Sequence, residues 1–76
     1  MANTVWTNVT NSSLVSAFKY DDVKQELSVR FRSNGSVYAY YDVSESLCKE
    51  IEESDSPGTV IHQKVIKGGK KYNKVI

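Results

Sequence analysis

The dipeptide Asn34-Gly35, set between two strand-like segments, constrains the fold of this chain more than any other feature. Residues 27–32 alternate apolar and polar side chains, which is the period of a strand with one buried face. Residues 36–41 are rich in valine and tyrosine, as strands often are. Asn-Gly supplies the positive φ angles that tight hairpins use. We therefore predict a β-hairpin with its turn at Asn34-Gly35.

The length of this turn decides which way the tyrosines of the hairpin point. A two-residue turn places Phe31 opposite Tyr38, and the tyrosines then share the face of Leu27, Val29 and Phe31. A three-residue turn over residues 33–35, with a glycine bulge, places Arg30 opposite Tyr38 instead. A shift of one residue moves every side chain to the other face. We favour the three-residue turn, because it lets Val37, Ala39 and Val43 continue the apolar face.

The other segments predict an α+β fold. Residues 14–20 read as a strand, and a helix begins at Asp42 with Glu45 as its capping-box partner. A second short helix starts at Pro57 with Ser56 as its cap and ends at Gly68-Gly69. Residues 70–76 form a last strand. We expect a small antiparallel sheet, a three-stranded meander plus a C-terminal strand, with the two short helices on one face.

Residues 1–11 form either a tail or an edge strand, and residues 12–76 form a single domain. Apolar spacing predicts the core, with Cys48 as a small core residue and with Ile61 and Val65 on one face of the second helix. The hydrophobic positions expected in the core are Leu27, Val29, Phe31, Val37, Leu47 and Ile51.

Composition excludes several classes of function. One cysteine and one histidine in 76 residues argue against a disulfide and against a metal site. No nucleophile–base set or phosphate-binding loop is visible, so we predict that the chain is not an enzyme and uses no cofactor. No apolar run is long enough to cross a membrane, and the N-terminus lacks the pattern of a signal peptide. We therefore expect a cytoplasmic protein.

Charge is distributed unevenly along the chain, although the net charge is only +1. Residues 42–55 hold six acidic residues and one lysine, whereas residues 64–74 hold five lysines and no acidic residue. The small net charge argues against tight binding to long RNA or DNA. The basic end remains compatible with a short anionic ligand.

Two kinds of side chain are candidates for binding such a ligand, and each also has a structural interpretation. Tyr38 and Tyr40 would stack on bases, or pack within the sheet. Arg30 and Arg32 would pair with phosphates, or lie on a solvated strand face. The lysines, with Lys64 and Lys71 as representatives, would add contacts, or only solvate the surface.

A third candidate is the start of the second helix, where free N–H groups near Ser56 and Gly58 would bind phosphate, although an ordinary capped turn explains the same residues. His62 is expected on the surface or packed against a helix.

The order of several short motifs resembles the KTSC domain, a module found at the C-terminus of some lysyl-tRNA synthetases and as a stand-alone protein in bacteria and phages. The resemblance runs from about Ser12 to Tyr72. It includes Ser12-Ser13, Tyr20-Asp21, Leu27-x-Val29-x-Phe31, Gly35-x-x-Tyr38-x-Tyr40, Asp42-Val43, Ser56-x-Gly58 and Ile66. This chain departs from the family in having one more residue between Phe31 and Gly35, and Val60-Ile61 where an aromatic residue is common. The resemblance implies an RNA-related role.

These observations lead to a hypothesis of a non-enzymatic nucleotide-recognition module. Its ligand would be RNA or a small or cyclic oligonucleotide. A phage-type sponge that sequesters a nucleotide immune signal, and so counters host defence, is one version. It would act in the host cytoplasm if phage-encoded, and it would fit a homo-oligomer, since one small domain hardly encloses a ligand. The alternative is a protein-interaction or assembly module that uses the tyrosines and arginines as interface anchors.

Overall fold

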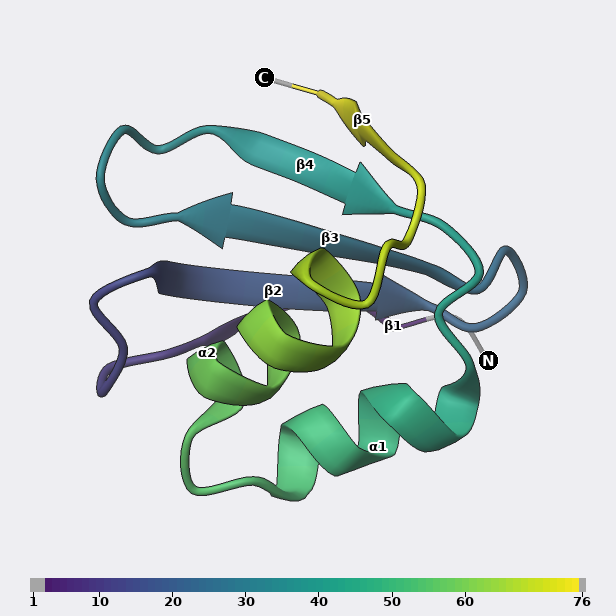
Figure 1. Cartoon of the computed structure of the whole chain (residues 1–76), viewed down its shortest axis with the longest axis horizontal. Coiled ribbons are helices and arrows are strands. Elements are labelled where there is room, and N and C mark those ends of the chain that lie inside the picture. The colour runs from purple at the N-terminus through teal and green to yellow at the C-terminus, as the bar shows by residue number, and fades with distance from the viewer. Residues whose placement is uncertain (1–2, 76) are drawn as a thin grey trace.

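A five-stranded antiparallel sheet forms the frame of the molecule, with the helices packed on one of its faces (Figure 1). The computed structural model describes residues 3–75. The strands lie in sequence order and are β1 (Asn3–Asn8), β2 (Val15–Asp21), β3 (Glu26–Phe31), β4 (Val37–Tyr40) and β5 (Tyr72–Lys74). The helical segments are α1 (Glu45–Glu53), α2 (Pro57–Val60) and η1 (Ile61–Ile66). The predicted α+β class is confirmed, with β1 as an additional edge strand.

The hairpin turn is longer than we predicted from the sequence. Arg30 pairs with Val37, and the N–H of Phe31 donates to the carbonyl oxygen of Ser36 at 2.9 Å, so residues 32–35 form a four-residue turn. Within it, Gly35 has a φ of 73° and its N–H donates to the carbonyl oxygen of Phe31. Asn34 acts as an acceptor for the N–H of Ser36 instead of as a second central residue of a tight turn. The three-residue turn was therefore the wrong prediction.

The register of this turn settles the direction of the tyrosines. Val29 pairs with Tyr38 and Leu27 with Tyr40, so both tyrosines lie on the face that the helices cover. Val37 and Ala39 lie on the opposite face. The two-residue turn predicted the correct face for the tyrosines, because the observed turn also contains an even number of residues. It did not predict the correct pairing partners.

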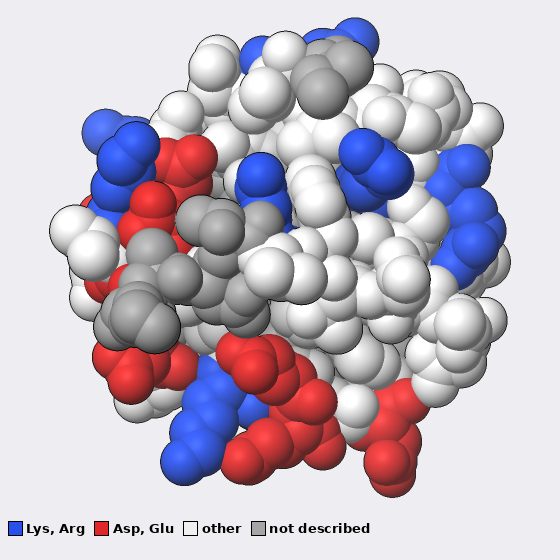
Figure 2. Space-filling model, turned by 180° about the vertical axis from the view of Figure 1, so that it is seen from behind, with Lys and Arg blue, Asp and Glu red and all other residues white. Residues whose placement is uncertain are grey.

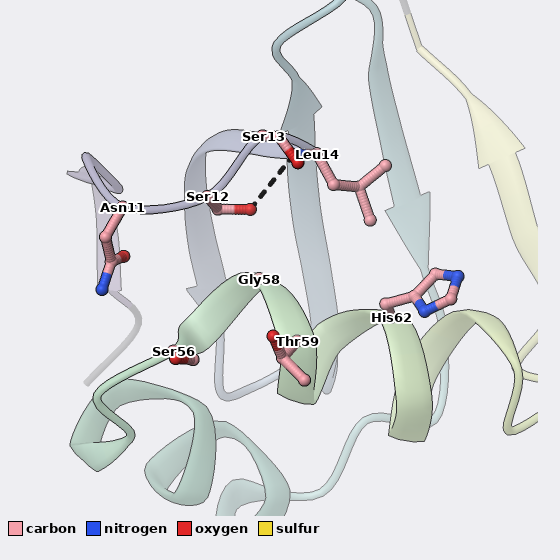
Figure 3. A pocket seen from close by; sticks show the side chains of 8 residues that line it. All are labelled: Asn11, Ser12, Ser13, Leu14, Ser56, Gly58, Thr59 and His62. Carbon is pink, nitrogen blue, oxygen red and sulfur yellow. Dashed lines mark hydrogen bonds between the residues drawn. The ribbon is translucent and has the colours of Figure 1, made fainter.

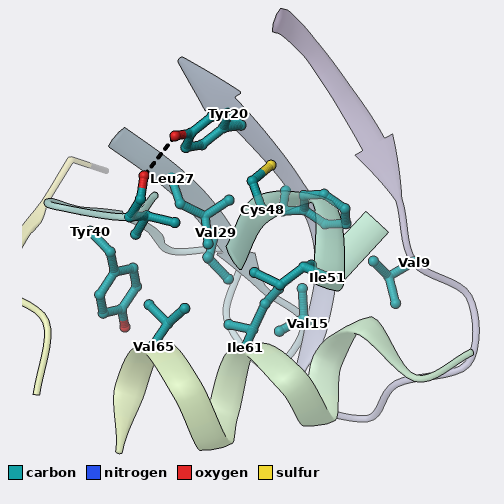
Figure 4. Packing of buried hydrophobic residues seen from close by; sticks show 12 residues of the cluster. Val9, Val15, Tyr20, Leu27, Val29, Tyr40, Cys48, Ile51, Ile61 and Val65 are labelled. Atoms are coloured by element: carbon teal, nitrogen blue, oxygen red, sulfur yellow. Dashed lines mark hydrogen bonds between the residues drawn. The ribbon is translucent and has the colours of Figure 1, made fainter. Parts of the chain in front are cut away.

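The core lies between the sheet and the helices (Figure 4). Leu27, Val29 and Ile51 are fully buried there, as predicted. The hydroxyl of Tyr20 donates to the carbonyl oxygen of Val43 at 2.6 Å and ties β2 to the segment that precedes α1. Phe31 and Leu47 are only partly buried against this cluster, so they are less central than the alternating pattern suggested.

The start of the first helix and the cap of the second differ from the prediction. Asp42 has a φ of 58°, a left-handed conformation that a helix cannot include, and α1 begins three positions later, at Glu45. Its N-cap is Ser44, whose hydroxyl accepts the N–H of Leu47 at 3.1 Å. Pro57 opens α2 as expected, but the side chain of Ser56 makes no capping hydrogen bond.

The sheet face away from the helices carries small buried residues and a tryptophan. Ala17, Val37 and Ala39 are buried there. Trp6 lies beside two cations, with Lys19 Nζ 4.9 Å and Arg30 Cζ 5.0 Å from its ring centre. Figure 2 shows the molecule from this side, with Asp and Glu at the left and along the bottom, and Lys and Arg at the top, at the right and among the acidic side chains.

Candidate functional site

The ligand-binding residues that we predicted from the sequence lie on different surfaces of the molecule. Tyr38 and Tyr40 lie on the helix-covered face of the sheet, whereas Arg30 lies on the other face beside Trp6. The expected side-by-side arrangement of Arg30 and Tyr38 is therefore wrong, and its cause is the additional residue in the hairpin turn. No single surface of residues 3–75 brings the predicted arginines and tyrosines together.

Arg32 holds two loops together. Its Nε donates to the carbonyl oxygen of Ser12 at 2.8 Å, and its guanidinium also reaches the carbonyl oxygens of Val9 and Val15. These bonds join the hairpin turn to the β1–β2 connection. The planar guanidinium suits this work because it presents several N–H donors in fixed directions. Arg32 lies in the turn after β3 and not on a strand face, and its predicted phosphate contact stays a prediction.

We expect Arg32→Lys to lower the free energy of unfolding by about 1–2 kcal/mol, since an ammonium group cannot reach three separate carbonyls. Arg30→Lys is the matched control, because its contact with Trp6 tolerates either cation and should change stability by less than about 0.5 kcal/mol. Urea unfolding of both variants measures the difference. Equal losses would show that the guanidinium of Arg32 is not a structural connection.

The remaining predicted residues lie elsewhere. Lys64 forms an ion pair with Glu50 at 2.5 Å on the outer side of the helices. Lys71 is exposed, and its carbonyl oxygen accepts the N–H of Tyr41. At the start of α2, the N–H groups of Thr59 and Val60 both donate to the carbonyl oxygen of Ser56. That pairing leaves few N–H groups for the phosphate site that we considered there.

An aromatic groove is the most distinctive concave surface on the helix-covered side. We define it by Phe31, Tyr38, Tyr40 and Tyr72, with Ser33, Asn34 and Ile66 completing its walls and a volume of about 310 Å³. The ring centres of Phe31 and Tyr38 are 5.4 Å apart, and Tyr72 lies 5.7 Å from both Tyr38 and Tyr40. The rings thus form a continuous row in mutual contact.

Tyr72 is the functional candidate that reasoning from the sequence missed. β5 pairs with β4 so that Tyr72 lies opposite Tyr40 and Lys74 lies opposite Tyr38. Tyr72 is 62% exposed, which leaves its ring open to a ligand. Tyr40 is buried, and burial, followed by the neighbouring Tyr72 and Tyr38, raises the pKa of its hydroxyl. The hydroxyl of Tyr40 therefore stays uncharged at neutral pH.

A polar hollow of about 390 Å³ opens beside the start of α2 (Figure 3). Its lining consists mainly of hydroxyl and amide side chains, together with Leu14, Gly58 and His62. The polar members are Asn11, Ser12, Ser13, Ser56 and Thr59.

The sides of the polar hollow meet at Gly58. A Cβ atom on Gly58 would lie 2.1 Å from the hydroxyl oxygen of Ser12, so only glycine permits this close approach. The Ser12 hydroxyl accepts the N–H groups of Leu14 and Val15, at 3.2 and 3.1 Å. The Ser12 and Ser-x-Gly motifs of the sequence therefore meet in one place, where they fix the shape of the hollow.

Residues 3–75 give little support for thiol chemistry or metal binding. The Cys48 thiol is buried and hydrogen-bonded to Glu52, and burial together with this contact raises its pKa to about 12, so it is a poor nucleophile. The described residues contain no group of three His, Cys, Asp or Glu side chains able to hold a metal ion. None of the helices among them is long and apolar enough to span a membrane.

Comparisons with known proteins agree with the resemblance noted from the motifs. The family model of the KTSC domain matches residues 11–72. A lysine–tRNA ligase from Nostoc sp. is 35% identical over 63 residues, which is 83% of this chain but only 11% of that relative. The crystal structure of a KTSC domain protein from Yersinia pestis superposes with a TM-score of 0.80 at 28% identity, covering 95% of this chain and 97% of that one.

Proposed function

The chain belongs to the KTSC domain family, and we propose that it is a non-enzymatic module that binds a nucleotide or short single-stranded RNA in the aromatic groove. The observation that carries this proposal is the row of rings from Phe31 through Tyr38 to Tyr72, with Tyr72 exposed at its rim. Stacking on aromatic side chains is the usual way in which proteins hold unpaired bases. The base would lie against Tyr72 and Tyr38.

The charge around the groove fits an anionic ligand. Lys74 lies directly across from Tyr38 on β5, and the segment between Ile66 and Tyr72 contains Lys67, Lys70 and Lys71. Among the described residues that line the groove, none is acidic. The ammonium of Lys70 donates to the carbonyl oxygen of Asp42 at 2.8 Å. A phosphate attached to a stacked base would therefore meet Lys74 first, with no carboxylate in the groove lining to repel it. These lysines replace Arg30 and Arg32, which lie elsewhere.

The KTSC relative from Nostoc supports RNA as the natural ligand class. Its name describes a protein that joins lysine to tRNA, and this chain spans about a tenth of its length. A domain of this size within a protein that handles tRNA would serve as a binding appendage. The proposal for this chain is limited to such binding, with no catalytic step.

Isothermal calorimetry against a short single-stranded RNA tests the proposal. We expect saturable binding whose affinity falls about fivefold for each lysine–phosphate contact when the salt concentration rises tenfold. Lys74→Gln should reduce this salt dependence, whereas Lys24→Gln, in the β2–β3 turn, should leave it unchanged. Absence of binding at low salt would refute the nucleotide proposal.

Binding of a protein partner is the second candidate, because an exposed Tyr72 beside an apolar groove is also the composition of an interface anchor. Its affinity would depend little on salt. The sponge version remains a prediction that light scattering tests. A mass above one chain at micromolar concentration would support it, and a monomer would remove it.

A further inference from the structure

The polar hollow lies next to the aromatic groove. The two have no lining residue in common, but their lining residues are neighbours at two points. On one wall His62 belongs to the hollow and Ile66 to the groove, four residues apart on the same helical segment. On the other wall Leu14 belongs to the hollow and Phe31 to the groove. The N–H of Arg32, next to Phe31, donates to the carbonyl oxygen of Leu14 at 2.9 Å. The hollow therefore continues the groove along η1.

The chemistry of the two surfaces is complementary. The groove offers aromatic faces, whereas the hollow offers hydroxyls and the imidazole of His62. None of the described residues that line the hollow carries a carboxylate side chain. Its hydroxyls donate to acceptor-rich groups, and the guanidinium of Arg32 adds positive charge behind the Ser12 carbonyl. Such a surface suits the phosphate or ribose of a nucleotide and is less suited to an apolar group.

From this arrangement we infer that the ligand is an oligonucleotide of at least two residues, with one base in the aromatic groove and the adjoining phosphate and ribose in the polar hollow. This inference rests on the proposed function. His62 and Ile66 lie about one turn apart on η1, so a ligand that contacts both must extend from the groove into the hollow. Thr59 and His62 are the side chains assigned to the second nucleotide.

Calorimetry with adenosine monophosphate and with the dinucleotide and trinucleotide of adenosine, each 5′-phosphorylated, tests this inference. We expect the dinucleotide to bind about tenfold more tightly than the monophosphate, as two additional hydrogen bonds would give. The trinucleotide should bind about as tightly as the dinucleotide.

The double variant Thr59→Val/His62→Ala should lose the preference for the dinucleotide and keep the affinity for the monophosphate. The monophosphate affinity thus shows that the variant is folded. Gln63→Ala is the matched control, since Gln63 is exposed on the same helical segment and does not line the hollow.

Three outcomes would overturn the inference. Equal affinities of the wild-type protein for the monophosphate and the dinucleotide would confine the ligand to the groove. An equal loss of affinity for both ligands in the double variant would mean that the substitutions disturb the fold and not a second contact. Failure of every nucleotide to bind would refute the proposed function itself, and the inference with it.

Discussion

Leu27→Ala is expected to lower the free energy of unfolding by about 2–5 kcal/mol, the largest loss of stability that we predict. Leu27 lies on β3, fully buried beneath the helices. Its truncation removes buried methyl groups and leaves a cavity that the surrounding strands cannot fill. A domain of 76 residues has a total stability of about 4–11 kcal/mol, so the variant should lose a large part of its stability.

Urea unfolding followed by far-ultraviolet circular dichroism measures this loss. Val23→Ala is the matched control, because Val23 is 82% exposed in the β2–β3 turn and its truncation should cost less than about 0.5 kcal/mol. A loss below about 1 kcal/mol for Leu27→Ala would contradict the assignment of the core to this face. Phe31→Ala should fall between the two, since Phe31 is only partly buried.

Tyr72→Ala is expected to weaken nucleotide binding by about ten- to a hundredfold, which corresponds to about 1–3 kcal/mol of lost stacking. Tyr72 contacts both Tyr38 and Tyr40 in the row of rings and is the most exposed of the three. The substitution removes the platform of the groove while leaving β4 in place. Calorimetry with the short RNA measures the change.

Two controls make this prediction specific to the groove. Tyr72→Phe keeps the aromatic face and should retain most of the affinity. Arg30→Ala alters the opposite face of the sheet, beside Trp6, and should leave binding unchanged. An effect of Arg30→Ala as large as that of Tyr72→Ala would move the site to the face that Figure 2 shows.

Local patterns in the sequence were sufficient to predict the hairpin, the helices and the fold class. They failed at the hairpin turn, where a difference of one residue in turn length decides which side chains face the helices. The turn holds four residues because Asn34 accepts the N–H of Ser36, and this acceptor role is not visible in the dipeptide Asn34-Gly35. Since side chains alternate along a strand, that single residue exchanged the faces of Val37 and Tyr38.

The candidate site was predictable only in part, because it depends on contacts between distant segments. Tyr38 and Tyr40 were identified from their own strand. Tyr72 joins them through the pairing of β4 with β5, some thirty residues along the chain. The same holds for the polar hollow, where Ser12 meets Gly58. Nothing within either segment indicates its partner, although the family motifs included all of these residues except Tyr72.

The position of Trp6 gives this small domain two separate optical reporters. Trp6 is the single tryptophan and lies on β1, between Lys19 and Arg30 on the face away from the helices. Its emission therefore follows the attachment of the N-terminal edge strand, whereas tyrosine absorption follows the rest of the domain, with three of the five tyrosines in the groove. If indole and backbone signals change at the same urea concentration, β1 unfolds together with the core. If the indole signal changes earlier, the edge strand separates from an otherwise folded domain.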